Sequence, residues 1–187
     1  MMRRLLAVFS VCALGLSADT LYSNLADGFN PQAGLTISGP GSLVGQLKTP
    51  AEPFTTTSPS SIDGIDLALG WVAGTNSAIV NLDTSNGSAP GDPIGSWTLN
   101  GLPVFGADYP LEHVSVQGVS LASGTYWITV GPGADDSWDA WNLADHTTMG
   151  AFDITGTSAP EAGTVASFLI WSLMALLITN RKRGMEN

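Results

Sequence analysis

A run of nineteen residues without a charged side chain, Ala162 to Asn180, most constrains the structure that this chain can form. A helix of that length spans about 28 Å, which matches the hydrocarbon thickness of a bilayer. The run is apolar on every face of such a helix, whereas a buried C-terminal helix of a soluble domain, the alternative, would be apolar on one face. We therefore predict a transmembrane helix over 164–180. The basic residues that follow it stay on the cytoplasmic side as a membrane stop: Arg181, Lys182 and Arg183.

The other end of the chain is typical of a secretory signal peptide. A short basic segment comes first, and the apolar run after it, Leu5 to Leu16, is too short to span a bilayer. We predict that residues 1–18 are removed on export, with cleavage after Ser17 as the alternative. The single cysteine, Cys12, lies in this apolar run, so the exported part cannot rely on a disulfide.

The region between these two segments is strongly acidic. Residues 19–159 contain fourteen acidic side chains and a single basic one, Lys48. Such a surface is repelled by phosphate backbones, so nucleic acid is excluded as a partner. About 140 residues are enough for one domain that buries its own core.

The composition of residues 19–157 predicts an all-β domain. Gly, Pro, Ser and Thr are frequent, no helical period is evident, and short alternating runs are separated by turn residues. The clearest period-two run is Ile62 to Trp71, while Thr125 to Val130 has the highest β-propensity. The number and spacing of such runs favour a β-sandwich or jelly roll. Four side chains in the two strongest runs are expected to be largely buried: Leu67, Leu69, Trp127 and Val130.

Residues Gly131 to Ala144 are rich in tryptophan and aspartate, and we interpret them as a loop. Hard cations prefer several converging oxygen ligands, which makes calcium a possible cofactor, although the spacing does not match an EF-hand. The candidate calcium ligands are Asp135, Asp136, Asp139 and Asp145. Exposed indoles stack on sugar rings, and the candidate carbohydrate-binding residues are Trp138 and Trp141. The simplest interpretation remains a solvated acidic loop whose tryptophans cover one end of the domain.

Catalytic patterns are not found in the sequence. The two histidines, His113 and His146, form no zinc-binding motif with a cysteine or a second histidine. The segment Gly118-Val119-Ser120-Leu121-Ala122 is one residue short of a nucleophile elbow and lies between predicted strands. We therefore expect no catalytic residues and no enzyme activity.

The C-terminal segment, 158–187, resembles the PEP-CTERM sorting signal of Gram-negative bacteria. That family has a Pro-Glu-Pro motif, a membrane helix and a basic end, in this order at the C-terminus. Here the motif, 160–163, reads Pro160, Glu161, Ala162 and Gly163, so alanine stands in place of the second proline. The resemblance implies recognition by an exosortase, a membrane cysteine protease-transpeptidase that cuts near the motif. It also implies a precursor anchored in the inner membrane and later placed in the cell envelope or extracellular matrix.

A second resemblance covers most of residues 20–155. The segments Leu21-Tyr22-Ser23-Asn24-Leu25 and Leu121-Ala122-Ser123-Gly124-Thr125-Tyr126-Trp127 are similar to the choice-of-anchor β domains, the R type in particular. Those domains often precede PEP-CTERM tails, and they have no established catalytic role. The two resemblances together imply a structural or adhesive surface module with exopolysaccharide as a possible partner. The alternative is a β-sandwich that binds calcium or polysaccharide.

Overall fold

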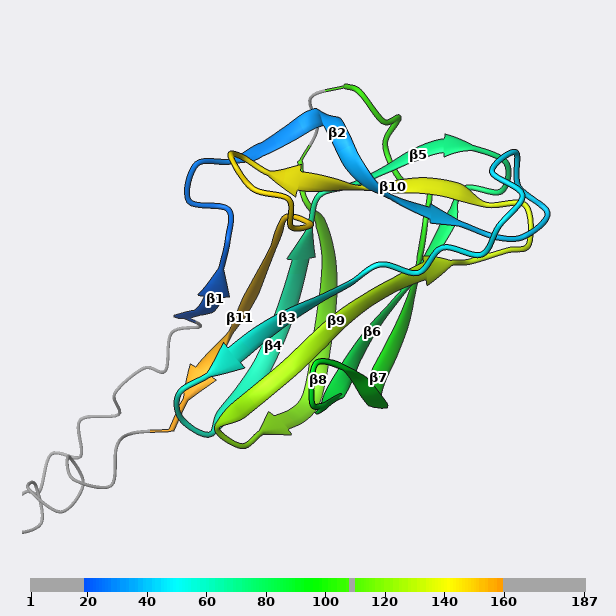
Figure 1. Cartoon of the computed structure of the whole chain (residues 1–187). Helices are drawn as coiled ribbons and strands as arrows, with labels where there is room; N and C mark the ends of the chain where they lie inside the picture. Colours follow the sequence, from blue (N-terminus) through cyan, green and yellow to red (C-terminus); the bar gives the residue numbers. More distant parts are fainter. Residues whose placement is uncertain (1–18, 108–109, 160–187) are drawn as a thin grey trace, which may run out of the picture.

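Every regular element in the described residues, 19–107 and 110–159, is a β-strand in this computed structural model (Figure 1). The all-β prediction is therefore confirmed. The predicted signal peptide, sorting motif, transmembrane helix and basic end all lie outside the described residues. Among the residues that are described, no helix is long and apolar enough to cross a membrane.

The strands form three antiparallel sheets. The first has the order β1-β11-β4-β8, from β1 (Asp19–Ser23), β11 (Phe152–Ser158), β4 (Ser60–Leu67) and β8 (Glu112–Leu121). The second has the order β3-β9-β6-β7, from β3 (Ala51–Thr56), β9 (Gly124–Pro132), β6 (Ser77–Asn86) and β7 (Ala89–Asn100). The third has the order β2-β10-β5, from β2 (Phe29–Ser38), β10 (Trp138–Ala144) and β5 (Leu69–Ala73).

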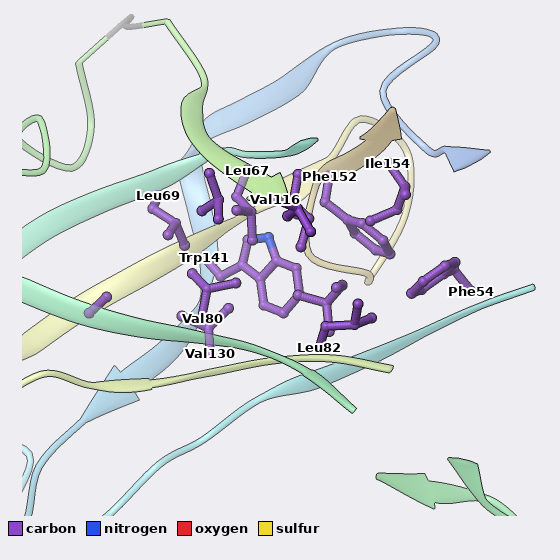
Figure 2. Close-up of a cluster of buried hydrophobic side chains, with 14 of the residues drawn as sticks. Phe54, Leu67, Leu69, Val80, Leu82, Val116, Val130, Trp141, Phe152 and Ile154 are labelled. Carbon is purple, nitrogen blue, oxygen red and sulfur yellow. The ribbon is translucent and has the colours of Figure 1, made fainter. Parts of the chain in front are cut away.

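The first two sheets pack against each other in a β-sandwich-like arrangement, and the third covers one end of the core (Figure 1). Alternate side chains of each strand point inward, so the two inner faces share one apolar core. Figure 2 shows Trp141 of the third sheet inserted into this core among side chains from both larger sheets: Leu67, Val116, Phe152, Val80, Leu82 and Val130.

The run Ile62 to Trp71 follows the predicted alternation but does not form one strand. Leu67 and Leu69 are fully buried, as predicted, and so is Ile65. The chain changes sheets at Ala68, whose N–H donates to the carbonyl oxygen of Ala151 at 3.1 Å. The first half of the run is therefore β4 and the second half is β5, and the prediction of a single strand is wrong.

The burial predicted for β9 is complete for Val130 and only partial for Trp127. Ile128 and Val130 are fully buried, and Trp127 alternates with them on the opposite face of the strand. The indole of Trp127 is half-buried, and its Nε1 donates to Ser85 Oγ at 3.2 Å. The high β-propensity of Thr125 to Val130 predicted a strand at the right place, but it did not predict which face of that strand is buried.

Prolines on two strands explain why those strands lie at sheet edges. Pro53 lies in β3 and Pro93 lies in β7, the two outer strands of the second sheet. Proline has no N–H to donate to a neighbouring strand, so inside a strand it is tolerated at an edge, whereas the central strand β9 has its proline, Pro132, at its last residue. Proline also discourages further strands from pairing there.

We expect Leu67→Ala to lower the free energy of unfolding by about 2–4 kcal/mol, because it leaves a cavity in the shared core. Urea unfolding followed by circular dichroism measures the change. A suitable control is Ile94→Ala, because Ile94 on β7 is already 38% exposed. That control should cost less than about 1 kcal/mol. A loss below about 0.5 kcal/mol for Leu67→Ala would contradict the assigned face.

Candidate functional site

The region predicted as an aspartate- and tryptophan-rich loop contains β10, the central strand of the third sheet. Asp135 and Asp136 are exposed in the turn before this strand, and Asp145 follows its far end. Asp139 lies within the strand and is fully buried. The strand therefore separates the four candidate calcium ligands instead of bringing their oxygens together. Across the described ranges, no group of three or more His, Cys, Asp or Glu side chains is placed to hold a metal ion.

Trp141 belongs to the core and cannot bind a sugar as predicted. Its side chain is 0% exposed, and its Nε1 donates to the carbonyl oxygen of Ala151 at 2.9 Å. Gly150 lies flat against the indole, since a Cβ at Gly150 would overlap the ring. Phe152 packs against the same indole with ring centroids 5.7 Å apart. The second candidate, Trp138, is half-buried at the start of β10.

Asp139 is a carboxyl group buried among apolar side chains. It lies opposite Ile37 on β2 and opposite Trp71 on β5, so it points to the same side of the sheet as Trp141 two residues later. Neither of its carboxyl oxygens has a hydrogen-bond partner, and the side chain is 0% exposed. Burial raises the pKa of Asp139 to about 7, because the charged form loses its hydration.

Glu52 is a second buried acid that the sequence did not identify. It lies on β3, and its Oε1 accepts a hydrogen bond from the N–H of Gly150 at 3.1 Å. Burial raises the pKa of Glu52, and the Gly150 hydrogen bond opposes part of that increase. The pKa of Tyr22 is also raised, first by burial and then by the charge of Glu52. The segment around Glu52 is rich in Pro, Thr and Ser, so no local pattern indicates burial.

A row of polar side chains crosses the first sheet. The strand register places Ser23, Asp153, Asp66 and His113 side by side on β1, β11, β4 and β8. His113 Nδ1 and Asp66 Oδ1 are 2.7 Å apart. The ring of His113 lies over Gly64, where a Cβ would come within 2.7 Å of its Cε1 atom. This pair lies on an open sheet surface, where the His113 side chain is 54% exposed.

Two cavities lie where the described chain begins and ends. One of about 320 Å³ is lined by residues of β4, β8 and β11 and their ends, among them Ser60, Leu121 and Thr157. A smaller one of about 150 Å³ lies between Asp19 and Ser158. Small hydroxyl side chains dominate both linings, and the Asp66–His113 pair belongs to neither. The two cavities therefore lie apart from the only acid–base pair that the described residues bring within hydrogen-bond distance.

The chain matches no family model, and no curated protein or solved structure is significantly similar to it. The roles of individual side chains therefore rest on the geometry of the described domain.

Proposed function

We propose that this chain is an exported, non-catalytic structural or adhesive module of the cell envelope or extracellular matrix of a Gram-negative bacterium. It would be sorted by its PEP-CTERM-like segment, 158–187, and processed by an exosortase. Exopolysaccharide is the matrix component that we propose as a further partner. For the domain itself, we propose a β-sandwich of the jelly-roll class with the third sheet as a cover.

One observation supports this proposal most directly: the domain begins and ends at the same place. β1 and β11 are paired antiparallel neighbours, and Asp19 lies opposite Gly156. The first and last strands of the described domain therefore lie side by side, as Figure 1 shows. A domain attached to the membrane through its C-terminus would have this end near the membrane and its opposite end facing outward.

The position of the last strand also fits processing near the sorting motif. Ala159 donates its N–H to the carbonyl oxygen of Pro59 at 2.8 Å, so the chain is held by the domain up to this residue. The motif begins at the next residue, Pro160. Cleavage after the motif would leave all eleven strands in place.

The non-catalytic part of the proposal rests on where the acidic groups lie. Asp139 and Glu52 are buried in the core, where no substrate reaches them. The Asp66–His113 pair lies on an open sheet surface outside both cavities. The strong negative charge of residues 19–159 suits a hydrated, repulsive surface that keeps exported copies soluble.

Mass spectrometry of the surface-exposed protein tests the proposal. We expect the wild-type protein to lack the residues beyond about Gly163, and a strain without exosortase to retain the intact chain in its inner membrane. The variant Leu173→Arg places a charge at mid-helix, which costs roughly 3 kcal/mol on insertion and should release the precursor from the membrane. The matched control Leu173→Ala should remain inserted. Recovery of a surface form that extends to Asn187 in the presence of exosortase would contradict processing but not anchoring.

A further inference from the structure

The loop between β2 and β3, residues 39–50, presents two leucines to solvent. Leu43 is 86% exposed and Leu47 is 63% exposed. The loop is nevertheless tied down by hydrogen bonds, because Ser38 and Lys48 exchange two backbone bonds of 3.1 and 2.8 Å. Ser38 Oγ also donates to the carbonyl oxygen of Gln46 at 2.7 Å. We call this segment the leucine loop.

The leucine loop lies at the end of the domain opposite to the chain termini. β3 leads from the loop at Ala51 to Thr56, and Thr56 lines the small cavity that also includes Asp19 and Ser158. Figure 1 shows the loop and the two ends of the described chain on opposite sides of the domain. The two exposed leucines are therefore remote from the proposed attachment to the membrane.

Opposite charges lie on this same end. Lys48, the only basic residue of 19–159, is exposed and forms no ion pair within the described ranges. The exposed residues Asp135 and Asp136 belong to the turn against which the leucine loop packs, since Gly41 donates its N–H to the carbonyl oxygen of Asp135 at 3.0 Å. A Cβ at Gly41 would overlap Asp135 Oδ2, so this carboxylate lies against the loop. The end of the domain thus combines two apolar side chains with an unpaired cation and two anions.

We propose that this end of the domain binds the same end of a second copy of the chain through a two-fold interface. In the proposed interface the leucines of the two copies meet, and Lys48 of each copy faces Asp135 and Asp136 of the other. A second copy is favoured over an anionic lipid surface because the two aspartates would repel lipid headgroups. The other charged side chains of 19–159 are acidic and repel those of a second copy, so the electrostatic attraction is confined to this end of the domain.

This pairing places the two attachment ends at the far sides of the pair. If the proposed anchoring holds, the pair connects copies on facing surfaces, which gives the adhesive module a specific partner. That consequence rests on the proposed function, whereas the pairing itself does not. The contact is small, so single pairs are weak and many copies on a surface act together.

Charge-reversal variants of the full-length chain in detergent test the pairing. Association is measured by analytical ultracentrifugation and by fluorescence anisotropy of labelled chains. Lys48→Glu leaves this end entirely acidic, and the double variant Asp135→Lys/Asp136→Lys leaves it entirely basic. Each variant alone should associate about tenfold more weakly than the wild type, because like charges then face each other. An equimolar mixture of the two variants should recover or exceed wild-type association and lose it at high salt.

The mixture also controls for misfolding and for contacts made by the tail, because the tail is identical in every chain and recovery requires two folded partners. Leu43→Ser/Leu47→Ser should weaken association in all combinations, while Ile94→Ser, at an exposed site on β7, should not. If each charge variant associates as strongly as the wild type, or if the mixture associates no more strongly than its components, the proposal is overturned.

Discussion

Replacing Asp139 with asparagine is expected to flatten the dependence of this domain's stability on pH. The carboxyl group is fully buried without a hydrogen-bond partner, and its neighbours across the sheet are Ile37 and Trp71. When a carboxyl ionises at such a buried position, the charge lacks its hydration, and no hydrogen bond compensates for that loss. Asparagine has nearly the same shape and cannot ionise, so it separates the effect of charge from the effect of packing.

The direction of the effect follows from the pKa. Burial raises the pKa of Asp139 from 3.8 to about 7 in the folded protein. Below about pH 4 the carboxyl is neutral in both the folded and unfolded states, so it adds no pH-dependent cost. Between about pH 4 and 7 only the unfolded state ionises, and the folded state loses stability relative to it. The full loss is on the order of 4 kcal/mol, because each pKa unit corresponds to about 1.4 kcal/mol.

Urea unfolding of the wild type and Asp139→Asn at several pH values between about 4 and 8 measures this loss. The unpaired amide has its own burial cost, which is independent of pH, so the slope with pH is the informative quantity. Burial also raises the pKa values of Glu52 and Glu112, and their contributions remain in both proteins. The matched control is Asp135→Asn, which removes an exposed carboxylate four residues earlier. If the curves of unfolding free energy against pH are parallel for the wild type and Asp139→Asn, the carboxyl of Asp139 does not have the raised pKa that its burial implies.

The misinterpretation of β10 shows why part of the fold was not predictable from the sequence. A strand with one wet face alternates apolar and polar residues, and β4 was recognised for this reason. In β10, four consecutive residues, 139–142, are all buried, and two of them are polar. Alternation is therefore absent, and Asp139 and Asn142 suggest a loop. Their burial depends on packing between sheets that are distant in sequence.

The leucine loop shows the opposite disagreement between sequence and structure. Residues Ser42 to Leu47 form a short apolar run of the kind that predicts a strand, but the structure places no strand there. Leu43 and Leu47 are exposed because no neighbouring strand pairs with the segment. Local patterns predicted the all-β class and the buried face of β4. They did not predict which apolar side chains find a partner, and Trp141 was therefore expected at the surface although it lies in the core.

The largest loss of stability from a single side chain is expected at Trp141, which lies at the centre of the core shown in Figure 2. Trp141→Ala removes the indole against which Gly150 and Phe152 pack, and also the donor to the carbonyl oxygen of Ala151. Such a truncation costs about 3–5 kcal/mol. Domains of this size are stable by about 5–15 kcal/mol, so the variant would retain little stability.

Two further variants separate packing from hydrogen bonding at this position. Trp141→Phe keeps most of the apolar surface and loses the indole N–H, so it should cost about 1–3 kcal/mol, in part because the Ala151 oxygen is left buried with one donor fewer. Trp138→Ala, three residues earlier on the same strand, should cost less than Trp141→Ala because Trp138 is only half-buried. Urea midpoints of the three variants, measured under one condition, give the order. If Trp138→Ala proves the more destabilising, the indole of Trp141 is not the centre of the core, and an exposed, ligand-binding position for Trp141 becomes the better explanation.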